Sequence, residues 1–247
     1  MTGSRGVLLV GHGSHLNPDS SAPTFAHAAH LRSLGCYDEV HVGFWKEEPS
    51  VARALEAFEA DDVTIVPVFM SNGYFVQQVI PRELRLDGRL SHVDGKILRY
   101  APAIGDHPSL AKVVVQRACE AGADGDDALA VLGHGTPRNP ESERNIYRQT
   151  EYVRQLGAFR EVTTVFLDQE PNMQDVFSMV EARRVVMVPL FIADGWHVGE
   201  TIPEDMALDA NAERADGRAL LYSAAVGTHA SVAQVIIELV EEAAAWK

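Results

Sequence analysis

Two kinds of apolar pattern alternate along this chain: short runs that are almost wholly apolar, and longer segments with helical spacing. The short runs are typical of strands buried on both faces and predict strands at residues 7–10, 40–44, 63–70 and 97–100. The helical spacing predicts helices at residues 20–34, 49–60 and 108–121. Residues 128–245 repeat this order. Alternating strands and helices predict α/β units, each a small parallel sheet flanked by helices.

The second half of the chain repeats the first at one constant offset of 122 residues. The matching segments include Gly11-His12-Gly13 with Gly133-His134-Gly135, Glu48-Pro49 with Glu170-Pro171, and Ile80-Pro81 with Ile202-Pro203. A single offset over so long a stretch indicates two copies of one unit. We therefore predict two similar lobes, residues 1–122 and 123–247, with a cleft between them. Ligands of such sheets bind beyond the carboxyl ends of the strands.

Composition narrows the class of partner. The 247 residues carry a formal net charge of −14, which argues against nucleic acid because phosphate binding needs surplus Lys and Arg. The two cysteines provide neither a metal-binding spacing nor a disulfide framework, as expected in a reducing cytoplasm. The longest apolar run, at residues 185–193, is far shorter than the roughly 20 residues of a membrane-spanning helix. We expect a cytoplasmic protein with no membrane partner.

Two histidines of the second copy are candidate metal ligands. His134 follows the first predicted strand of that copy, and His197 follows its third. Both therefore lie at carboxyl strand ends, where two imidazoles suit a transiently bound divalent ion such as cobalt or iron. The alternative is that each histidine only hydrogen-bonds within its own turn.

The first copy provides a comparison for this pair. It keeps His12, but Phe75 stands where the second copy has His197, so this lobe is not expected to hold a metal ion by itself. His12 remains a candidate for the cleft, and packing in the core is the alternative role for Phe75.

Carboxylates accompany the histidine pair. Glu200 is three residues after His197, which places both on one side of a helix and makes Glu200 a candidate proton acceptor. Asp168, at the end of the second strand of this copy, is expected to face the cleft. Arg138 belongs to a group of arginines suited to bind carboxylates in forked pairs. A solvated surface position is the alternative for Arg138.

The motifs resemble those of the class II chelatases, and more narrowly the CbiX-type sirohydrochlorin cobaltochelatases in their two-lobed form. The resemblance rests on Leu-Leu-Val-Gly-His-Gly-Ser, the repeated Val-Pro-x-Phe segments with Gly-Trp-His, and Tyr-x-x-x-x-Gly-x-His. It covers nearly the whole chain, and two copies in register are more specific than one Gly-His-Gly alone.

The resemblance implies a lyase that inserts a divalent metal into the tetrapyrrole sirohydrochlorin for cobalamin or siroheme synthesis. Cobalt, or else iron, would be a substrate, and no permanently bound cofactor is expected. His134 and His197 would bind the metal and take the pyrrole protons, with Glu200 passing them to solvent. The macrocycle would contact Tyr74, Phe75, Trp196, Arg138 and Asp168. A sirohydrochlorin ferrochelatase and a non-catalytic metal or tetrapyrrole carrier remain alternatives, and the oligomeric state stays open.

Overall fold

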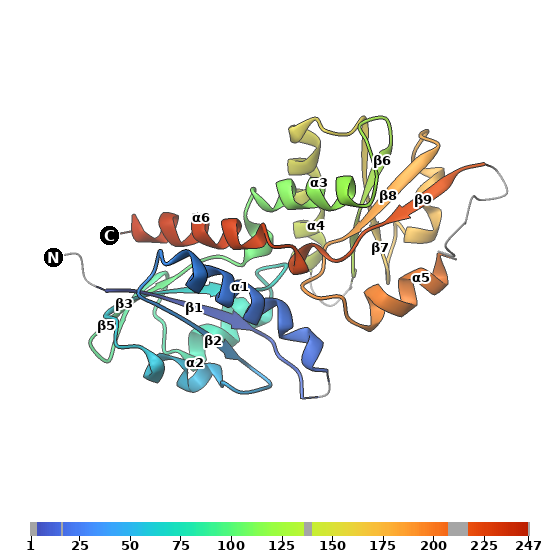
Figure 1. The fold of residues 1–247 in the computed structure, drawn as a ribbon. Helices are drawn as coiled ribbons and strands as arrows, with labels where there is room; N and C mark the ends of the chain where they lie inside the picture. Colours follow the sequence, from blue (N-terminus) through green and yellow to red (C-terminus); the bar gives the residue numbers. More distant parts are fainter. Residues whose placement is uncertain (1–3, 16, 136–139, 207–216, 247) are drawn as a thin grey trace. The chain divides into compact units, whose positions relative to one another are not determined.

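The computed structural model describes residues 4–15, 17–135, 140–206 and 217–246. These residues form two compact units, which are coloured along the chain in Figure 1. Unit 1 comprises Met1–His107 with Ala230–Lys247, and unit 2 comprises Pro108–His229. Each unit is built on one sheet, so the predicted α/β class with two similar lobes is confirmed.

The sheet of unit 1 has the strand order β2-β1-β3-β5-β4. Its strands are β1 (Arg5–Gly11), β2 (Glu39–Phe44), β3 (Asp62–Pro67), β4 (Leu90–Val93) and β5 (Lys96–Tyr100). All neighbours pair in parallel except β4, which runs antiparallel to β5. The sequence pattern did not predict β4, a four-residue edge strand with only one buried side chain.

Helices cover both faces of this sheet. The helical elements of unit 1 with four or more residues are α1 (Ala22–Leu34), 3₁₀ helix η2 (Val51–Ala57), π-helix η3 (Phe75–Val79), α2 (Ile80–Glu83) and α6 (Val232–Ala244). Leu8 and Val10 of β1 pack with Val51 of η2 and Ile80 of α2, whereas α1 and α6 lie on the other side of the strands (Figure 1). Helix α1 ends as predicted at Gly35, which adopts the left-handed conformation with φ 63°. The helix predicted over residues 49–60 is a shorter 3₁₀ helix.

Unit 2 repeats this arrangement with the strand order β7-β6-β8-β9, all parallel. Its strands are β6 (Ala128–Gly133), β7 (Glu161–Phe166), β8 (Arg184–Pro189) and β9 (Ala219–Tyr222). Its described helical elements with four or more residues are α3 (Leu110–Glu120), α4 (Pro140–Leu156), 3₁₀ helix η5 (Met173–Ser178), π-helix η6 (His197–Thr201) and α5 (Ile202–Asp205). The core strand β6 is buried at every position, as its apolar run predicts.

The compact units differ from the sequence repeats in one element. Helix α3 belongs to the first repeat but packs on α4 and β8 of unit 2, and α6 belongs to the second repeat but packs on β3 and β5 of unit 1. The lobes as packed therefore do not divide at residues 122 and 123, the boundary that the repeat alone suggests. Both helices present the same kind of apolar stripe, so the sequence pattern does not distinguish the two ways of packing them.

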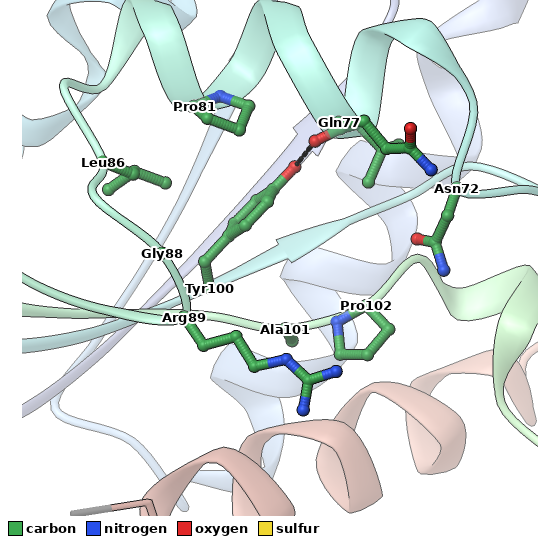
Figure 2. A pocket seen from close by; sticks show the side chains of 10 residues that line it. Asn72, Gln77, Pro81, Leu86, Gly88, Arg89, Tyr100, Ala101 and Pro102 are labelled. Atoms are coloured by element: carbon green, nitrogen blue, oxygen red, sulfur yellow. Dashed lines mark hydrogen bonds between the residues drawn. The ribbon is translucent and has the colours of Figure 1, made fainter.

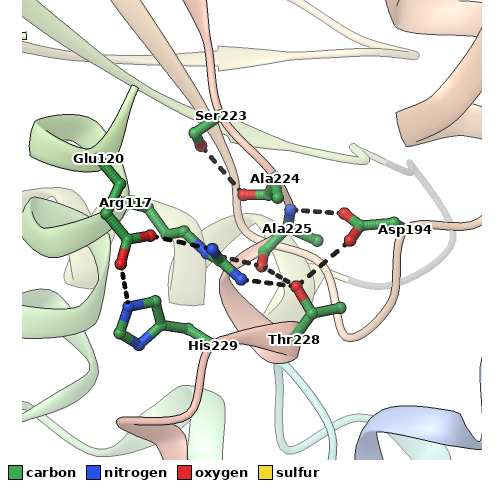
Figure 3. A network of polar contacts seen from close by, with 8 residues as sticks. All are labelled: Arg117, Glu120, Asp194, Ser223, Ala224, Ala225, Thr228 and His229. Atoms are coloured by element: carbon green, nitrogen blue, oxygen red, sulfur yellow. Dashed lines mark hydrogen bonds and ion pairs between the residues drawn. The ribbon is translucent and has the colours of Figure 1, made fainter. Parts of the chain in front are cut away.

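Equivalent polar contacts hold α3 in unit 2 and α6 in unit 1, the two helices that pack on the sheet of the other repeat. In unit 2, Nε2 of His229 lies 2.9 Å from Oε1 of Glu120 on α3, and Arg117 of the same helix donates to Ala225 O and Thr228 Oγ1 (Figure 3). In unit 1, Nε2 of His107 lies 3.1 Å from Oε1 of Glu242 on α6. His107 and His229 are the last residues before the chain passes from one unit to the other.

Candidate functional site

The loop after β6 fixes the conformation of His134. Nδ1 of His134 lies 2.9 Å from the carbonyl oxygen of Gly135 and 3.3 Å from Oδ2 of Asp168. Both partners are acceptors, so the tautomer that satisfies them carries its proton on Nδ1 and has its lone pair on Nε2. A donor contact of this kind orients metal-binding histidines. His134 is thus prepared to bind a metal ion through Nε2.

Backbone geometry at the strand ends positions this pair. Asp168 N donates to His134 O at 2.9 Å, which joins the loop after β7 to the loop after β6. Gly135 has φ 76°, and a Cβ atom there would lie 2.6 Å from Cγ of Gln169, so only glycine suits the turn. The side chains of His134 and Asp168 are 44% and 54% exposed, so an ion can reach them from solvent.

His197 begins the π-helix η6, but the position of its side chain lies outside what the structure describes. Arg138 lies wholly outside the described residues. Glu200 is exposed on η6, and Trp196 directly before it is 66% exposed. Among the described residues, no group of three or more His, Cys, Asp and Glu side chains is arranged to hold a metal ion. The predicted pairing of His134 with His197 therefore remains a prediction.

In unit 1 the structure describes both the Gly-His-Gly turn and the first residue of the π-helix, so their contact can be seen there. His12 makes the same contact as His134, with Nδ1 2.9 Å from Gly13 O. Phe75 begins the π-helix η3 just as His197 begins η6, and its ring packs edge-on against the His12 ring at a centroid distance of 4.7 Å. In unit 1, the first residue of the π-helix thus contacts the histidine of the Gly-His-Gly turn.

The π-helices were not predicted, although the sequence contains a signal for them. Pro81 and Pro203 follow in the first turns of α2 and α5, and proline has no N–H to continue α-helical hydrogen bonding. Before Pro81, Ile80 N donates to Phe75 O five residues back, the π-helical pattern. Such turns occur often at functional sites.

Tyrosines anchor both π-helices to the neighbouring strands. The Tyr100 hydroxyl donates to Val76 O at 2.5 Å, and the Tyr222 hydroxyl donates to Val198 O at 3.0 Å. Burial raises the pKa of both phenols, so they stay protonated and keep donating. Tyr100 and Tyr222 are the tyrosines of the two Tyr-x-x-x-x-Gly-x-His segments, and the motif alone did not predict this contact.

A pocket of about 490 Å³ lies beside the π-helix of unit 1 (Figure 2). Its polar wall comes from Asn72, Gln77 and Arg89, and Tyr100 also lines it. None of the predicted site residues is among its described lining, so its position gives no support to the predicted chemistry. Arg89 also stacks over the Trp246 ring at 5.6 Å.

Asn72 and its counterpart Asp194 support the loops that lead to the π-helices. Asn72 Oδ1 accepts from Ala103 N at 2.9 Å, and Asp194 Oδ1 accepts from Ala225 N at 2.6 Å. The second hydrogen bonds of the two side chains run in opposite directions. Asn72 Nδ2 donates to Asp106 at 2.8 Å. Asp194 instead accepts from the Thr228 hydroxyl at 3.3 Å (Figure 3). The two loops are thus held by hydrogen bonds at equivalent places, although the donor and acceptor atoms of one bond differ between the units.

Two α/β units with histidines at the ends of their first strands define the chelatase class of fold. The CbiX family model matches residues 6–121 and again residues 128–243, and the chain belongs to the CbiX family. The family resemblance seen in the motifs is therefore confirmed. No helix in the described part of the chain is long and apolar enough to cross a membrane.

Curated relatives share the sequence over different lengths. A protein of Halobacterium salinarum named probable sirohydrochlorin cobaltochelatase is 42% identical over 97% of this chain and 91% of its own length. A sirohydrochlorin cobaltochelatase of Methanopyrus kandleri is 33% identical over 47% of this chain and 95% of its own length, so it corresponds to one repeat.

Solved structures show the same fold. The multi-domain protein DR2241 of Deinococcus radiodurans, described as structurally similar to chelatases, matches with a TM-score of 0.85 and 31% identity. The match covers 96% of this chain but only 54% of that protein, so this chain spans about half its length. SirB of Bacillus subtilis matches with a TM-score of 0.78 at 21% identity, over 98% of this chain and 96% of SirB.

Proposed function

We propose that this protein inserts Co²⁺ into sirohydrochlorin. The observation that carries the proposal is the His134–Asp168 pair at the carboxyl end of the unit 2 sheet, where Nδ1 is the donor and the Nε2 lone pair suits a divalent ion. The names of the curated relatives supply the substrate and favour cobalt.

His197 is the second metal ligand in this proposal. Phe75, at the same place in unit 1, packs directly on His12, and the two π-helices begin at equivalent residues. A histidine at that place in unit 2 would bring a second imidazole to the ion beside His134. Neutral imidazoles bind cobalt and iron with enough strength for capture while leaving the ion transferable.

The reaction must remove two protons from the macrocycle for each divalent ion that enters. Asp168 contacts His134 directly, so its carboxylate would stabilise the imidazolium that forms when Nε2, having released the ion to the macrocycle, accepts one pyrrole proton. His197 would accept the second proton, and Glu200, exposed on η6, would pass protons on to solvent. In this proposal the two histidines serve first the ion and then the protons that it displaces.

The second unit differs from the first at each of these positions. Asp168, His197 and Glu200 correspond to Lys46, Phe75 and Gln78. At each of these positions unit 1 lacks the group that would favour a metal ion, and at one of them Lys46 adds a positive charge. Metal handling is therefore assigned to unit 2 alone.

Anaerobic initial rates with metal-free sirohydrochlorin test the proposal, with Co²⁺ and Fe²⁺ supplied separately. We expect repeated turnover with Co²⁺, at a rate above that with Fe²⁺, and loss of at least 10²-fold in His134→Ala and His197→Ala. His92→Ala, at an exposed position on β4, is the matched control. A faster reaction with Fe²⁺ would instead indicate a ferrochelatase. Stoichiometric binding without turnover would indicate a carrier, and full activity of both variants would refute the site.

A further inference from the structure

Unit 1 carries an aromatic cluster at the carboxyl ends of its strands, which we call the aromatic face. The Phe75 ring lies at its centre, and the other rings have centroids 4.7–6.3 Å away. The members are His12, Trp45, Phe69, Tyr74 and Phe75. Tyr74 is 65% exposed and Trp45 is 37% exposed. A cluster this exposed has apolar area to offer a ligand rather than to the core.

Unit 2 differs from unit 1 at two of the apolar rings, although four of the five equivalent positions also carry rings, namely His134, Phe191, Trp196 and His197. Trp45 corresponds to Leu167, and Phe75 corresponds to His197. The two copies have the same fold, so the aromatic face is not a requirement of that fold. The indole of Trp45 and the phenyl ring of Phe75 are what distinguish this face of unit 1 from the equivalent edge of unit 2.

The charges at this edge are also inverted between the copies. Lys46 stands where unit 2 has Asp168, and Arg82 stands where unit 2 has Glu204. The Arg82 guanidinium lies over the Trp45 ring at 5.9 Å and is held there by Glu83, to which it donates at 2.8 Å. Lys46 follows Trp45 and donates its backbone N–H to His12 O at 2.9 Å.

Two carboxylates near the aromatic face are engaged with the protein. Glu47 accepts from Ser14 N at 3.0 Å, and Glu83 binds Arg82. Arg82 remains 63% exposed in this contact, so it has donors to offer a further carboxylate. In a chain with a net charge of −14, exposed cations beside exposed aromatic rings indicate a flat ligand that carries negative charge.

We propose that the aromatic face binds the sirohydrochlorin ring by stacking, while Arg82 and Lys46 bind its carboxylates. This inference rests on the proposed function and adds a division of labour: unit 1 holds the tetrapyrrole, and unit 2 holds the ion. A metal ion gains no ligand from Phe75 and is repelled by the two cations, whereas a flat polycarboxylate is attracted by both features.

Replacing residues of unit 1 with those that unit 2 has at the same places tests this directly. Trp45→Leu and Arg82→Glu are exposed substitutions, and circular dichroism and melting temperature check that both variants fold. We measure the Kd of the full chain for metal-free sirohydrochlorin without metal by absorbance titration, then kcat and KM with Co²⁺. Arg183→Glu, an exposed charge reversal before the amino end of β8, is the matched control.

We expect Kd and KM to rise about fivefold or more in Trp45→Leu and about tenfold or more in Arg82→Glu. The kcat and the affinity for Co²⁺ alone stay near wild type, because stacking and carboxylate binding act before the ion enters. Unchanged Kd and KM in both variants would overturn the inference while leaving the proposed function intact. Loss of Co²⁺ binding in either variant would also overturn it. A wild-type chain that neither binds nor converts sirohydrochlorin would refute the proposed function itself.

Discussion

His107 contacts Glu242, a residue 135 positions later in the chain, with 3.1 Å between Nε2 and Oε1. The equivalent contact joins His229 to Glu120 at 2.9 Å. In each case, the histidine ends the part of the chain that forms a unit, and the glutamate is on the helix that the other repeat supplies. The two contacts thus mark where the repeats exchange their last helices.

The exchange predicts that core substitutions act on the opposite repeat. Ile236 on α6 and Val114 on α3 occupy equivalent positions and are both fully buried. Ile236→Ala should cost about 2–5 kcal/mol and should speed hydrogen exchange in β3 and β5. Val114→Ala should destabilise β6 and β8 instead. If Ile236→Ala loosened the strands of its own repeat, β6 and β8, the exchange would be refuted.

Asp168 is expected to tune the metal site through His134. Asp168→Asn keeps an oxygen acceptor for Nδ1 but removes the negative charge, so affinity for Co²⁺ should fall about 10–100-fold. Calorimetric titration of the wild-type and variant proteins with Co²⁺ measures the change. Asp175→Asn, an exposed neutralisation on η5, provides the comparison at equal net charge. Equal affinity in both variants would show that Asp168 does not act on the ion.

The metal site should be transferable to unit 1. Lys46→Asp combined with Phe75→His gives the first copy the counterparts of Asp168 and of the proposed ligand His197, and His12 already has the matching Nδ1 contact. The double variant should bind two Co²⁺ ions per chain where the wild type binds one. Adding His12→Ala should return the stoichiometry to one. A double variant that still binds a single ion would show that further residues of unit 2 are needed.

Lowering the pH should remove the contribution of the buried Asp127 carboxylate to the stability of the fold. Arg184 donates to Asp127 at 2.6 Å, and this hydrogen bond lowers the pKa of Asp127 despite the opposing effect of burial. A lowered pKa in the folded state means that the carboxylate stabilises the fold above its ordinary pKa of about 4 and loses this effect as pH falls below it. Asp127→Asn should therefore cost about 2 kcal/mol at pH 7 and progressively less below pH ~4.

Denaturant unfolding of the Asp127→Asn variant across pH 3–7 measures this change. Asp126→Asn, at an exposed neighbouring position, should show a constant difference from wild type. A difference for Asp127→Asn that grew in acid would contradict the assigned direction of the pKa shift.

A glycine beside the site admits no larger residue. A Cβ atom on Gly227 would lie 2.3 Å from Ile192 O, and Gly227 N donates to Phe191 O at 2.8 Å. Gly227→Ala should displace the segment that leads to Trp196 and His197, at a cost of about 1–3 kcal/mol, and lower turnover with it. Gly195→Ala adds a Cβ with nothing within 4 Å, so its melting temperature should match that of wild type.

Much of the fold was predictable because one repeat determines two units. The apolar runs fixed the parallel strands, and Gly35 fixed the end of α1. Strand β4 escaped prediction because its side chains are mostly exposed, so it lacks the apolar run on which the other predictions rest. The helix exchange escaped because α3 and α6 present equivalent apolar stripes to equivalent sheets.

The site was predictable in part for a related reason. The Gly-His-Gly turn predicted His134 as a site residue. The 122-residue offset showed that Phe75 of the first copy stands where the second copy has His197. The same offset pairs Lys46 with Asp168 and Arg82 with Glu204, so the charge inversion was already present in the sequence. Its meaning needed the structure, in which Asp168 contacts His134 and Arg82 lies over Trp45.

The helix exchange also determines the order in which this protein can be completed during synthesis. Unit 2 is continuous in sequence and has all its elements once residue 229 has been made. The strands of unit 1 are translated first, yet β3 and β5 lack their covering helix until α6 has been made. Because domains fold as units during synthesis, unit 2 has all its elements before unit 1 does, and the apolar face of β3 and β5 stays uncovered while unit 2 is being made.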